Sequence, residues 1–311
     1  MNWERDAEVR LVSRSADVQS EEPRYRLPVD WVTVSNLRLP LMILEEYGVR
    51  LASVPIIKAS VGLPAHQRGI HASRTYEAIS SVLAEAARAD GRIASEIARK
   101  MLELHSYGMV SRVVINAQAF FLEKTPVYNA DSYQAFDVML RADALRRPDD
   151  IRTRELMGVR VSGVTACPCA KEVIRTLYTS GKGGGLPLGT HMQRARASVA
   201  TESHPSVRLS DLVSIARDSF SNGTVEYLKR LDEARLVVEA IEKPRFVEDV
   251  AREIVFRMVS SFPTVPDGNL ILVGVKAFES IHDHDLEARL RTTFGEARER
   301  LGIGFGTTTM A

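Results

Sequence analysis

The chain has 311 residues, a formal net charge of +1 and 45% hydrophobic residues, as expected of a globular protein with one large or two medium domains. This charge balance gives no general attraction to nucleic acid or to a membrane surface, so an anionic ligand must be held by a local site. The N-terminal stretch lacks the apolar segment of a signal peptide, and no apolar run is long enough for a membrane span, which predicts a cytoplasmic protein.

Hydrophobic periodicity predicts a mixed order of strands and helices. Residues 1–27 are polar and aperiodic, and we expect a flexible N-terminal segment there. Alternation predicts strands over 32–41, 51–62, 110–126 and 132–145, and helical spacing predicts helices over 73–90 and 91–108. After a polar break at 146–150, strands are expected over 156–167, 194–203 and 269–281, with helices over 207–220 and 245–262. Two strands, two helices and two strands are followed by two strands, two helices and a further long strand, and this repeated order predicts one module over 28–150 and another over 151–311.

The two cysteines, Cys167 and Cys169, flank a proline in the sequence ACPCAKE. A disulfide between such near neighbours would be strained, and the proline predicts that the preceding strand ends here. The spacing is also shorter than the C-x(2–4)-C of a zinc knuckle, so at most one thiol is expected to bind a metal. From the spacing alone, a buried thiol, a reactive thiol and a metal ligand all remain open.

His282 and His284 lie in the sequence ESIHDHD. If the preceding strand continues through them, both imidazoles project from one face beside Asp283 and Asp285, which would suit half of a metal site. The alternative is a solvated loop. Glu248 is expected in the first turn of a helix, where a carboxylate is also favoured by the helix dipole.

The glycine-rich stretch at 182–189 lacks the GK[ST] ending of a phosphate-binding loop and predicts a mobile surface loop.

Six short motifs occur in the order found in one family. They are GIHASR at 69–74, CPCAKE at 167–172, HMQR at 191–194, KRLDE at 229–233, FVED at 246–249 and ESIHDH at 279–284. Together they resemble the type IB GTP cyclohydrolases over roughly residues 30–290. The resemblance implies an α+β tunnel fold, in which two tandem ββααββ modules form antiparallel sheets with helices on one face. It also implies a homo-oligomer, a dimer or tetramer, with active sites at the subunit interfaces.

The resemblance also implies a set of site residues. The metal ligands would be Cys167, His191, Glu233 and His282, and the catalytic residues Cys167, His191 and His284. The metal would be one divalent ion per subunit, with Fe²⁺ preferred over Mn²⁺ or Zn²⁺. Glu248 would bind the guanine of GTP through two hydrogen bonds. The other substrate-binding candidates are His71, Arg74, Lys171 and Arg194, the last three for the triphosphate.

The reaction implied is hydrolysis of the guanine imidazole ring of GTP with release of formate, giving a 7,8-dihydroneopterin phosphate. The segment between Cys167 and His191 is 23 residues long, and this length resembles the archaeal branch of the family more than the bacterial one. The archaeal branch forms the 2′,3′-cyclic phosphate on the way to methanopterin-type cofactors. Met192 departs from the family, which usually has Asn there. The alternatives are a bacterial-type enzyme that makes dihydroneopterin triphosphate for folate, a deazaguanine nitrile reductase with Cys167 as nucleophile, and an inactive purine- or metal-binding protein.

Overall fold

A computed structural model describes residues 17–38, 50–51, 54–85, 92–179 and 189–303. The first sixteen residues of the expected flexible segment and nearly all of the glycine-rich stretch at 182–189 lie outside these ranges. Among the described residues, no helix is long and apolar enough to cross a membrane.

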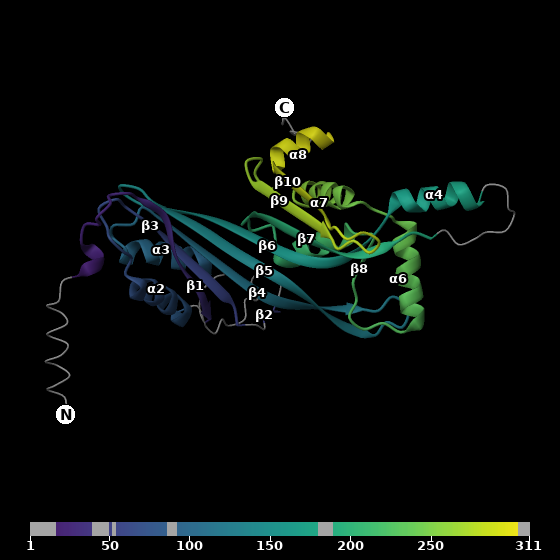
Figure 1. Cartoon of the computed structure of the whole chain (residues 1–311), viewed down its shortest axis with the longest axis horizontal. Helices are drawn as coiled ribbons and strands as arrows, with labels where there is room; N and C mark the ends of the chain where they lie inside the picture. Colours follow the sequence, from purple (N-terminus) through teal and green to yellow (C-terminus); the bar gives the residue numbers. More distant parts are fainter. Residues whose placement is uncertain (1–16, 39–49, 52–53, 86–91, 180–188, 304–311) are drawn as a thin grey trace, which may run out of the picture. The chain divides into compact units, whose positions relative to one another are not determined.

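The described elements follow the predicted order closely (Figure 1). The strands are β1 (Val29–Arg38), β2 (Arg50–Leu51), β3 (Ile56–Leu63), β4 (Val110–Lys124), β5 (Asp131–Arg146), β6 (Ile151–Ala166), β7 (Met192–Glu202), β8 (Asn222–Gly223), β9 (Leu270–Ala277) and β10 (Leu286–Thr293). The helices are the 3₁₀ turn η1 (Val18–Ser20), α2 (Ala72–Glu85), α3 (Ile93–Leu104), α4 (Pro168–Thr179), α5 (Leu209–Asp218), α6 (Arg230–Glu242), α7 (Val247–Ser261) and α8 (Phe294–Leu301). The chain pattern did not predict η1, α4, β8, α6, β10 or α8.

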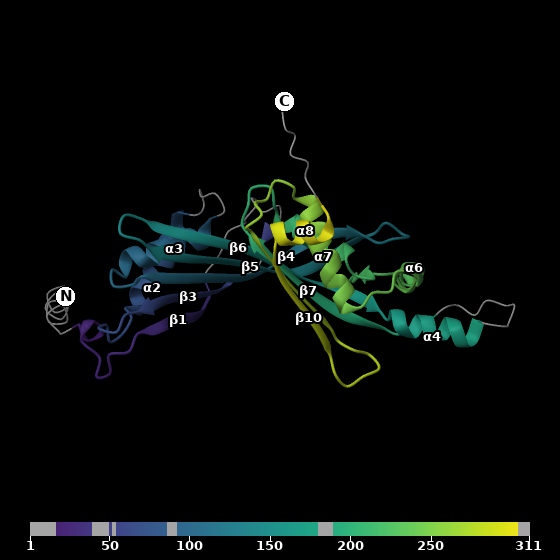
Figure 2. The same ribbon diagram turned by 90° about the horizontal axis from the view of Figure 1, so that it is seen from above.

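The strands of the described residues form one ten-stranded sheet in the order β1-β3-β4-β5-β6-β7-β9-β10, with β2 beside β4 and β8 beside β6 (Figure 2). The pairs β6–β7, β7–β9 and β9–β10 are antiparallel. The chain divides into two compact units: unit 1 comprises 1–37, 57–114 and 142–154, and unit 2 comprises 38–56, 115–141 and 155–311. Each unit joins separate stretches of sequence because β4, β5 and β6 run through both. The expected α+β class with an antiparallel sheet is confirmed.

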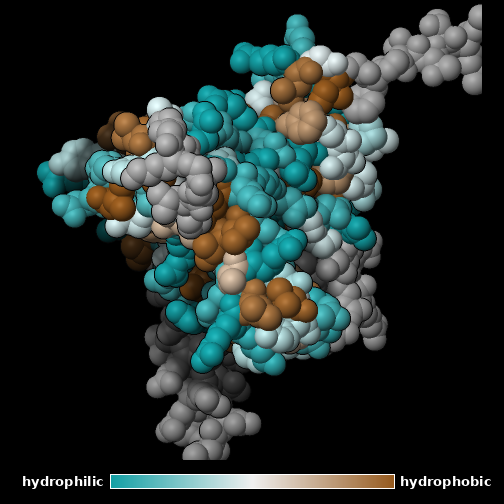
Figure 3. Space-filling view, turned by 90° about the vertical axis from the view of Figure 1, so that its right-hand side faces the viewer, coloured by the Kyte–Doolittle hydropathy of each residue, from teal (hydrophilic) through white to brown (hydrophobic). Residues whose placement is uncertain are grey.

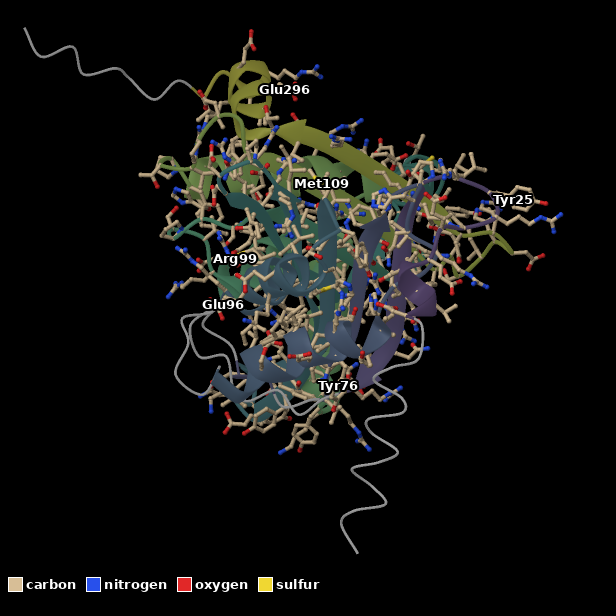
Figure 4. The ribbon with its side chains drawn as sticks, turned by 90° about the vertical axis from the view of Figure 1, so that its left-hand side faces the viewer. Tyr25, Tyr76, Glu96, Arg99, Met109 and Glu296 are labelled. Atoms are coloured by element: carbon tan, nitrogen blue, oxygen red, sulfur yellow. The ribbon has the colours of Figure 1, made fainter. Side chains whose placement is uncertain are left out.

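In unit 1, α2 and α3 pack against each other. Ile79 of α2 and Ile97 and Met101 of α3 are completely buried, because the apolar residues of each helix share one face. Glu96 and Arg99 lie on the exposed face of α3 and point outward (Figure 4). The amphipathic pattern that predicted these helices therefore also predicted which side is buried.

In unit 2, α7 packs on β9 and β10, while α5 packs on β7 and against α7. Ile254 and Met258 of α7 and Leu209 and Leu212 of α5 are completely buried. This core supports the end of the sheet at which β6 and β7 meet the residues of the candidate site.

Close packing in unit 2 requires a glycine at position 163. A Cβ on Gly163 of β6 would lie 2.1 Å from Cδ2 of the fully buried Phe220, far inside normal contact distance. We therefore expect Gly163→Ala to lower the free energy of unfolding by about 1–3 kcal/mol, the usual cost of overpacking a core. Urea unfolding measures this change.

Gly274→Ala is the matched control, because Gly274 lies in β9 of the same sheet, one strand beyond β7, and its Cβ would meet no atom within 4 Å. Equal effects of the two substitutions would show that the contact with Phe220 is not the cause.

Candidate functional site

Cys167 lies at the junction between a strand and a helix. β6 ends at Ala166 and α4 begins at Pro168, so the proline occupies the first helical position, where a missing N–H costs nothing. The backbone N–H of Ala170 donates to Cys167 Sγ at 3.4 Å. The predicted end of the strand at this proline is confirmed. Both cysteines are free thiols, with Cys169 exposed and Cys167 half-buried.

His191 lies directly beside Cys167, although 23 residues separate them in sequence. The antiparallel pairing of β6 and β7 places Ala166 opposite Met192. The backbone N–H of Cys167 donates to the carbonyl of His191 at 3.1 Å, and Thr190 Oγ1 donates to the carbonyl of Cys167 at 2.7 Å. Two predicted ligands are thereby joined at the ends of paired strands.

The two other histidines lie in a loop and not in a strand. β9 ends at Ala277, so the strand predicted over 269–281 is wrong in its last four residues. The chain turns through 278–285 and pairs again at Leu286, which lies opposite Ala277. Strand alternation therefore does not apply to these histidines.

The histidine rings nevertheless come together. The rings of His282 and His284 stack with centroids 4.9 Å apart and planes within 12°. The ring of His191 meets that of His282 edge-on, with centroids 6.5 Å apart. The structure thus gathers three imidazoles beside the Cys167 junction.

Two residues that the sequence reasoning did not assign complete this cluster. Gln193 Oε1 lies 3.1 Å from Nδ1 of His191, and Gln193 Nε2 donates to Glu279 Oε1 at 3.3 Å. The signal was present in the sequence, because positions 191 and 193 are two residues apart at the start of a strand and so share a face.

Glu233 is exposed in the first turn of α6, next to the buried Asp232. Asp232 accepts hydrogen bonds from the backbone N–H groups of Val127 at 2.8 Å, Lys229 at 3.1 Å and Tyr128 at 3.2 Å. Burial of this carboxyl opposes its ionisation, but the three N–H groups outweigh burial and lower its pKa. Asp232 thereby caps α6 and fixes the start of the helix, which sets the position of Glu233.

The donor chemistry of the cluster suits a divalent metal. A free thiol and several imidazoles are ligands for zinc and ferrous iron, and the contact of His191 Nδ1 with Gln193 leaves its Nε2 available. Among the residues that the structure describes, however, no three His, Cys, Asp or Glu side chains converge closely enough to hold a metal. The predicted ligand set therefore stays a prediction.

In unit 1, His71 belongs to a network of polar side chains. Its Nε2 lies 3.0 Å from both carboxylate oxygens of Asp17, and its backbone N–H donates to Tyr107 Oη at 3.3 Å. Tyr107 Oη also lies 2.9 Å from Nδ1 of the buried His105, whose Nε2 is 3.1 Å from Thr75 Oγ1. Burial lowers the pKa of His105 to about 4, so its imidazole is neutral near pH 7.

The basic residues predicted to bind the triphosphate occupy different surroundings. Lys171 Nζ donates to the carbonyl of Ile241 at 2.7 Å, and Arg74 Nη1 lies at 3.5 Å from the carbonyl of Leu104. Arg194 is exposed on β7. Arg74 and His71 belong to unit 1, whereas the predicted metal ligands belong to unit 2.

The exposed side of α4 carries an apolar stripe. Val173, Leu177 and Tyr178 are 49%, 66% and 59% exposed, and they lie on one side of the helix. Figure 3, which faces the end where Figure 1 shows α4 and α6, displays separate hydrophobic patches on this surface.

Residues 16–288 match the family described as Type I GTP cyclohydrolase folE2. The match covers most of the chain, and the chain belongs to this family. The family and the enzyme class expected from the six motifs, a hydrolase that acts on GTP, are both confirmed.

The chain is also similar to curated relatives over nearly its whole length. It is 33% identical to GTP cyclohydrolase MptA of Methanococcus maripaludis over 308 residues, which cover 92% of this chain and 97% of that protein. It is 32% identical to GTP cyclohydrolase MptA of Methanothermobacter thermautotrophicus over 300 residues, which cover 91% of this chain and 94% of that protein.

Among solved structures, a highly active BTUO variant aligns with a TM-score of 0.50 over 85% of this chain and 98% of that chain. A uricase from Bacillus fastidious aligns with a TM-score of 0.46 over 92% of this chain and 98% of that chain. The sequence identities are 10% and 11%, and the likeness to the BTUO variant concerns the fold alone.

Proposed function

We propose that this protein is a metal-dependent GTP cyclohydrolase of the archaeal type, which forms 7,8-dihydroneopterin 2′,3′-cyclic phosphate and formate from GTP. The product would enter reduced pterin biosynthesis, of the methanopterin or folate type. The proposal rests on one observation in a member of this family. A backbone hydrogen bond holds Cys167 beside His191, and the ring of His191 meets the ring of His282. The similarity to proteins named MptA supports the archaeal-type product.

The proposed metal ligands are Cys167, His191, Glu233 and His282, with Fe²⁺ preferred over Mn²⁺ or Zn²⁺. Such an ion, when bound, supplies Lewis-acid activation of water. The hydrogen bond from the backbone N–H of Ala170 to Cys167 Sγ holds the sulfur at the start of α4. His284, stacked on His282, is well placed to accept or donate protons during ring opening.

The substrate would be held by charged side chains of the family motifs. Glu248, exposed in the first turn of α7, has the two acceptor oxygens that match the ring N–H and exocyclic amine of guanine. Arg194, Lys171 and Arg74 are proposed for the triphosphate and His71 as a further substrate contact. For Lys171 this requires that its ammonium leave the carbonyl of Ile241.

The assembly proposed is a homo-oligomer, a dimer or tetramer, in which the sites are completed at interfaces between subunits. The exposed apolar stripe of α4 supports this proposal. We further propose two tandem ββααββ modules, over 28–150 and 151–311, in a cytoplasmic enzyme. The recurring element order supports the two modules.

The product distinguishes the proposed reaction from its alternatives. Anaerobic incubation with GTP and Fe²⁺ should release formate and a dihydroneopterin cyclic phosphate, resolved by mass spectrometry. Dihydroneopterin triphosphate with formate would retain the family reaction and reject the archaeal-type product. Absence of formate with Fe²⁺, Mn²⁺ and Zn²⁺ would contradict the cyclohydrolase, leaving nitrile reduction at Cys167 or simple purine binding.

The two neighbouring cysteines should differ in metal binding. Cys167→Ser should lose the bound metal, because a serine hydroxyl is a poor replacement for a thiolate ligand. Cys169→Ser removes an equally small thiol two residues away and should keep the metal. Metal content after anaerobic loading measures both, and equal losses would refute the assignment.

Substitution of Glu248 should separate guanine binding from metal binding. Glu248→Gln replaces one acceptor oxygen by a donor, so GTP affinity should fall roughly 10- to 100-fold while metal content is unchanged. Glu96→Gln makes the same change in the first turn of α3 and is the control. GTP affinity that is the same in both variants would rule out guanine binding by Glu248.

A further inference from the structure

A short chain of hydrogen bonds connects His191, just before the start of β7, to the carboxylate of Glu279, just beyond the end of the neighbouring strand β9. Gln193 lies between them, with Oε1 at 3.1 Å from His191 Nδ1 and Nε2 at 3.3 Å from Glu279 Oε1. The backbone holds this chain in place, because the N–H of Phe278 donates to the carbonyl of Arg194 at 2.9 Å. Gln193 is half-buried, so the bridge is partly shielded from water.

The chemistry of the three groups allows only one direction of hydrogen bonding. An ionised carboxylate only accepts, so Glu279 must receive an N–H from the Gln193 amide. The amide oxygen of Gln193 then faces His191 and must accept from it. His191 Nδ1 therefore carries the proton, and Nε2 holds a free lone pair.

We propose that Glu279, acting through Gln193, fixes the tautomer and ring orientation of His191 so that Nε2 is always the nitrogen offered to the metal. Both are positioning residues, and the inference rests on the proposed metal-binding role of His191. A polar partner on the second ring nitrogen raises the basicity of a ligating imidazole, and its loss usually costs 10- to 100-fold in metal affinity.

The bridge also explains why an amide, and not a carboxylate, suits position 193. A carboxylate there would face the carboxylate of Glu279 at hydrogen-bonding distance, where like charges repel. The amide alone accepts from the imidazole and donates to the carboxylate at the same time.

The experiment uses the full chain with Glu279→Gln. A carboxamide at position 279 can donate or accept, so it no longer dictates the orientation of the Gln193 amide. In metal-free protein labelled with ¹⁵N-histidine, His191 should change from one tautomer to a mixture. Zn²⁺ affinity, measured by chelator competition, should fall about 10- to 100-fold.

Glu287→Gln is the control, because it removes the same charge from an exposed carboxylate of β10 that pairs with Arg289. The exchanged pair Gln193→Glu with Glu279→Gln restores the direction of the bridge, since the carboxylate at 193 accepts from both neighbours. This double variant should recover the single tautomer and most of the affinity, which a merely structural role would not predict.

A single His191 tautomer in Glu279→Gln, with unchanged Zn²⁺ affinity, would overturn the proposal. The outcome is separable from the proposed function. If wild-type protein binds no Zn²⁺ through His191, the metal site itself is wrong, whereas a tautomer that depends on Glu279 is still observed in the metal-free protein.

Discussion

The antiparallel pairing of β6 with β7 is the interaction on which the candidate site depends. The two strands pair continuously from Leu156 opposite Glu202 to Ala166 opposite Met192. Because this register is fixed by buried residues such as Val161 and Ala197, a slip by one residue would turn the core side chains outward. The same register that buries the core therefore holds Cys167 beside His191, and the site needs no direct contact between their side chains to be aligned.

Strands and helices with a regular apolar pattern were predictable from the sequence. The long strands β4 and β5 and the helices α2, α3, α5 and α7 bury one face each, so the hydrophobic period of the sequence gives both their type and their approximate bounds. The helix α4 was not predicted, because the proline between the two cysteines indicated the end of a strand, and in the structure that proline is also the first residue of the helix. β10 was missed for a similar reason, since its charged residues alternate on an exposed edge.

The residues of the candidate site were proposed from motifs, and their arrangement was not predictable. Spacing suggested that His282 and His284 share the face of a strand, yet their rings stack within a loop after the end of β9. The contact of Gln193 with Glu279 joins residues 86 positions apart, and the hydrophobic periodicity of a short segment cannot predict such a distant contact. Glu233 shows the same limit, because its relation to the other proposed ligands depends on tertiary packing, which no local pattern reports.

The buried carboxylate of Asp232 limits how this protein can vary during evolution. One side chain holds the start of α6 and the backbone of Val127 and Tyr128, about a hundred residues earlier in the chain. The hairpin loop between β4 and β5 is exposed, and such loops usually tolerate insertions and deletions. Here a change of loop length would withdraw two N–H donors from Asp232 and loosen the turn that carries Glu233. The length of the loop between β4 and β5 and the presence of an acidic residue at position 232 are therefore expected to be retained together in evolution.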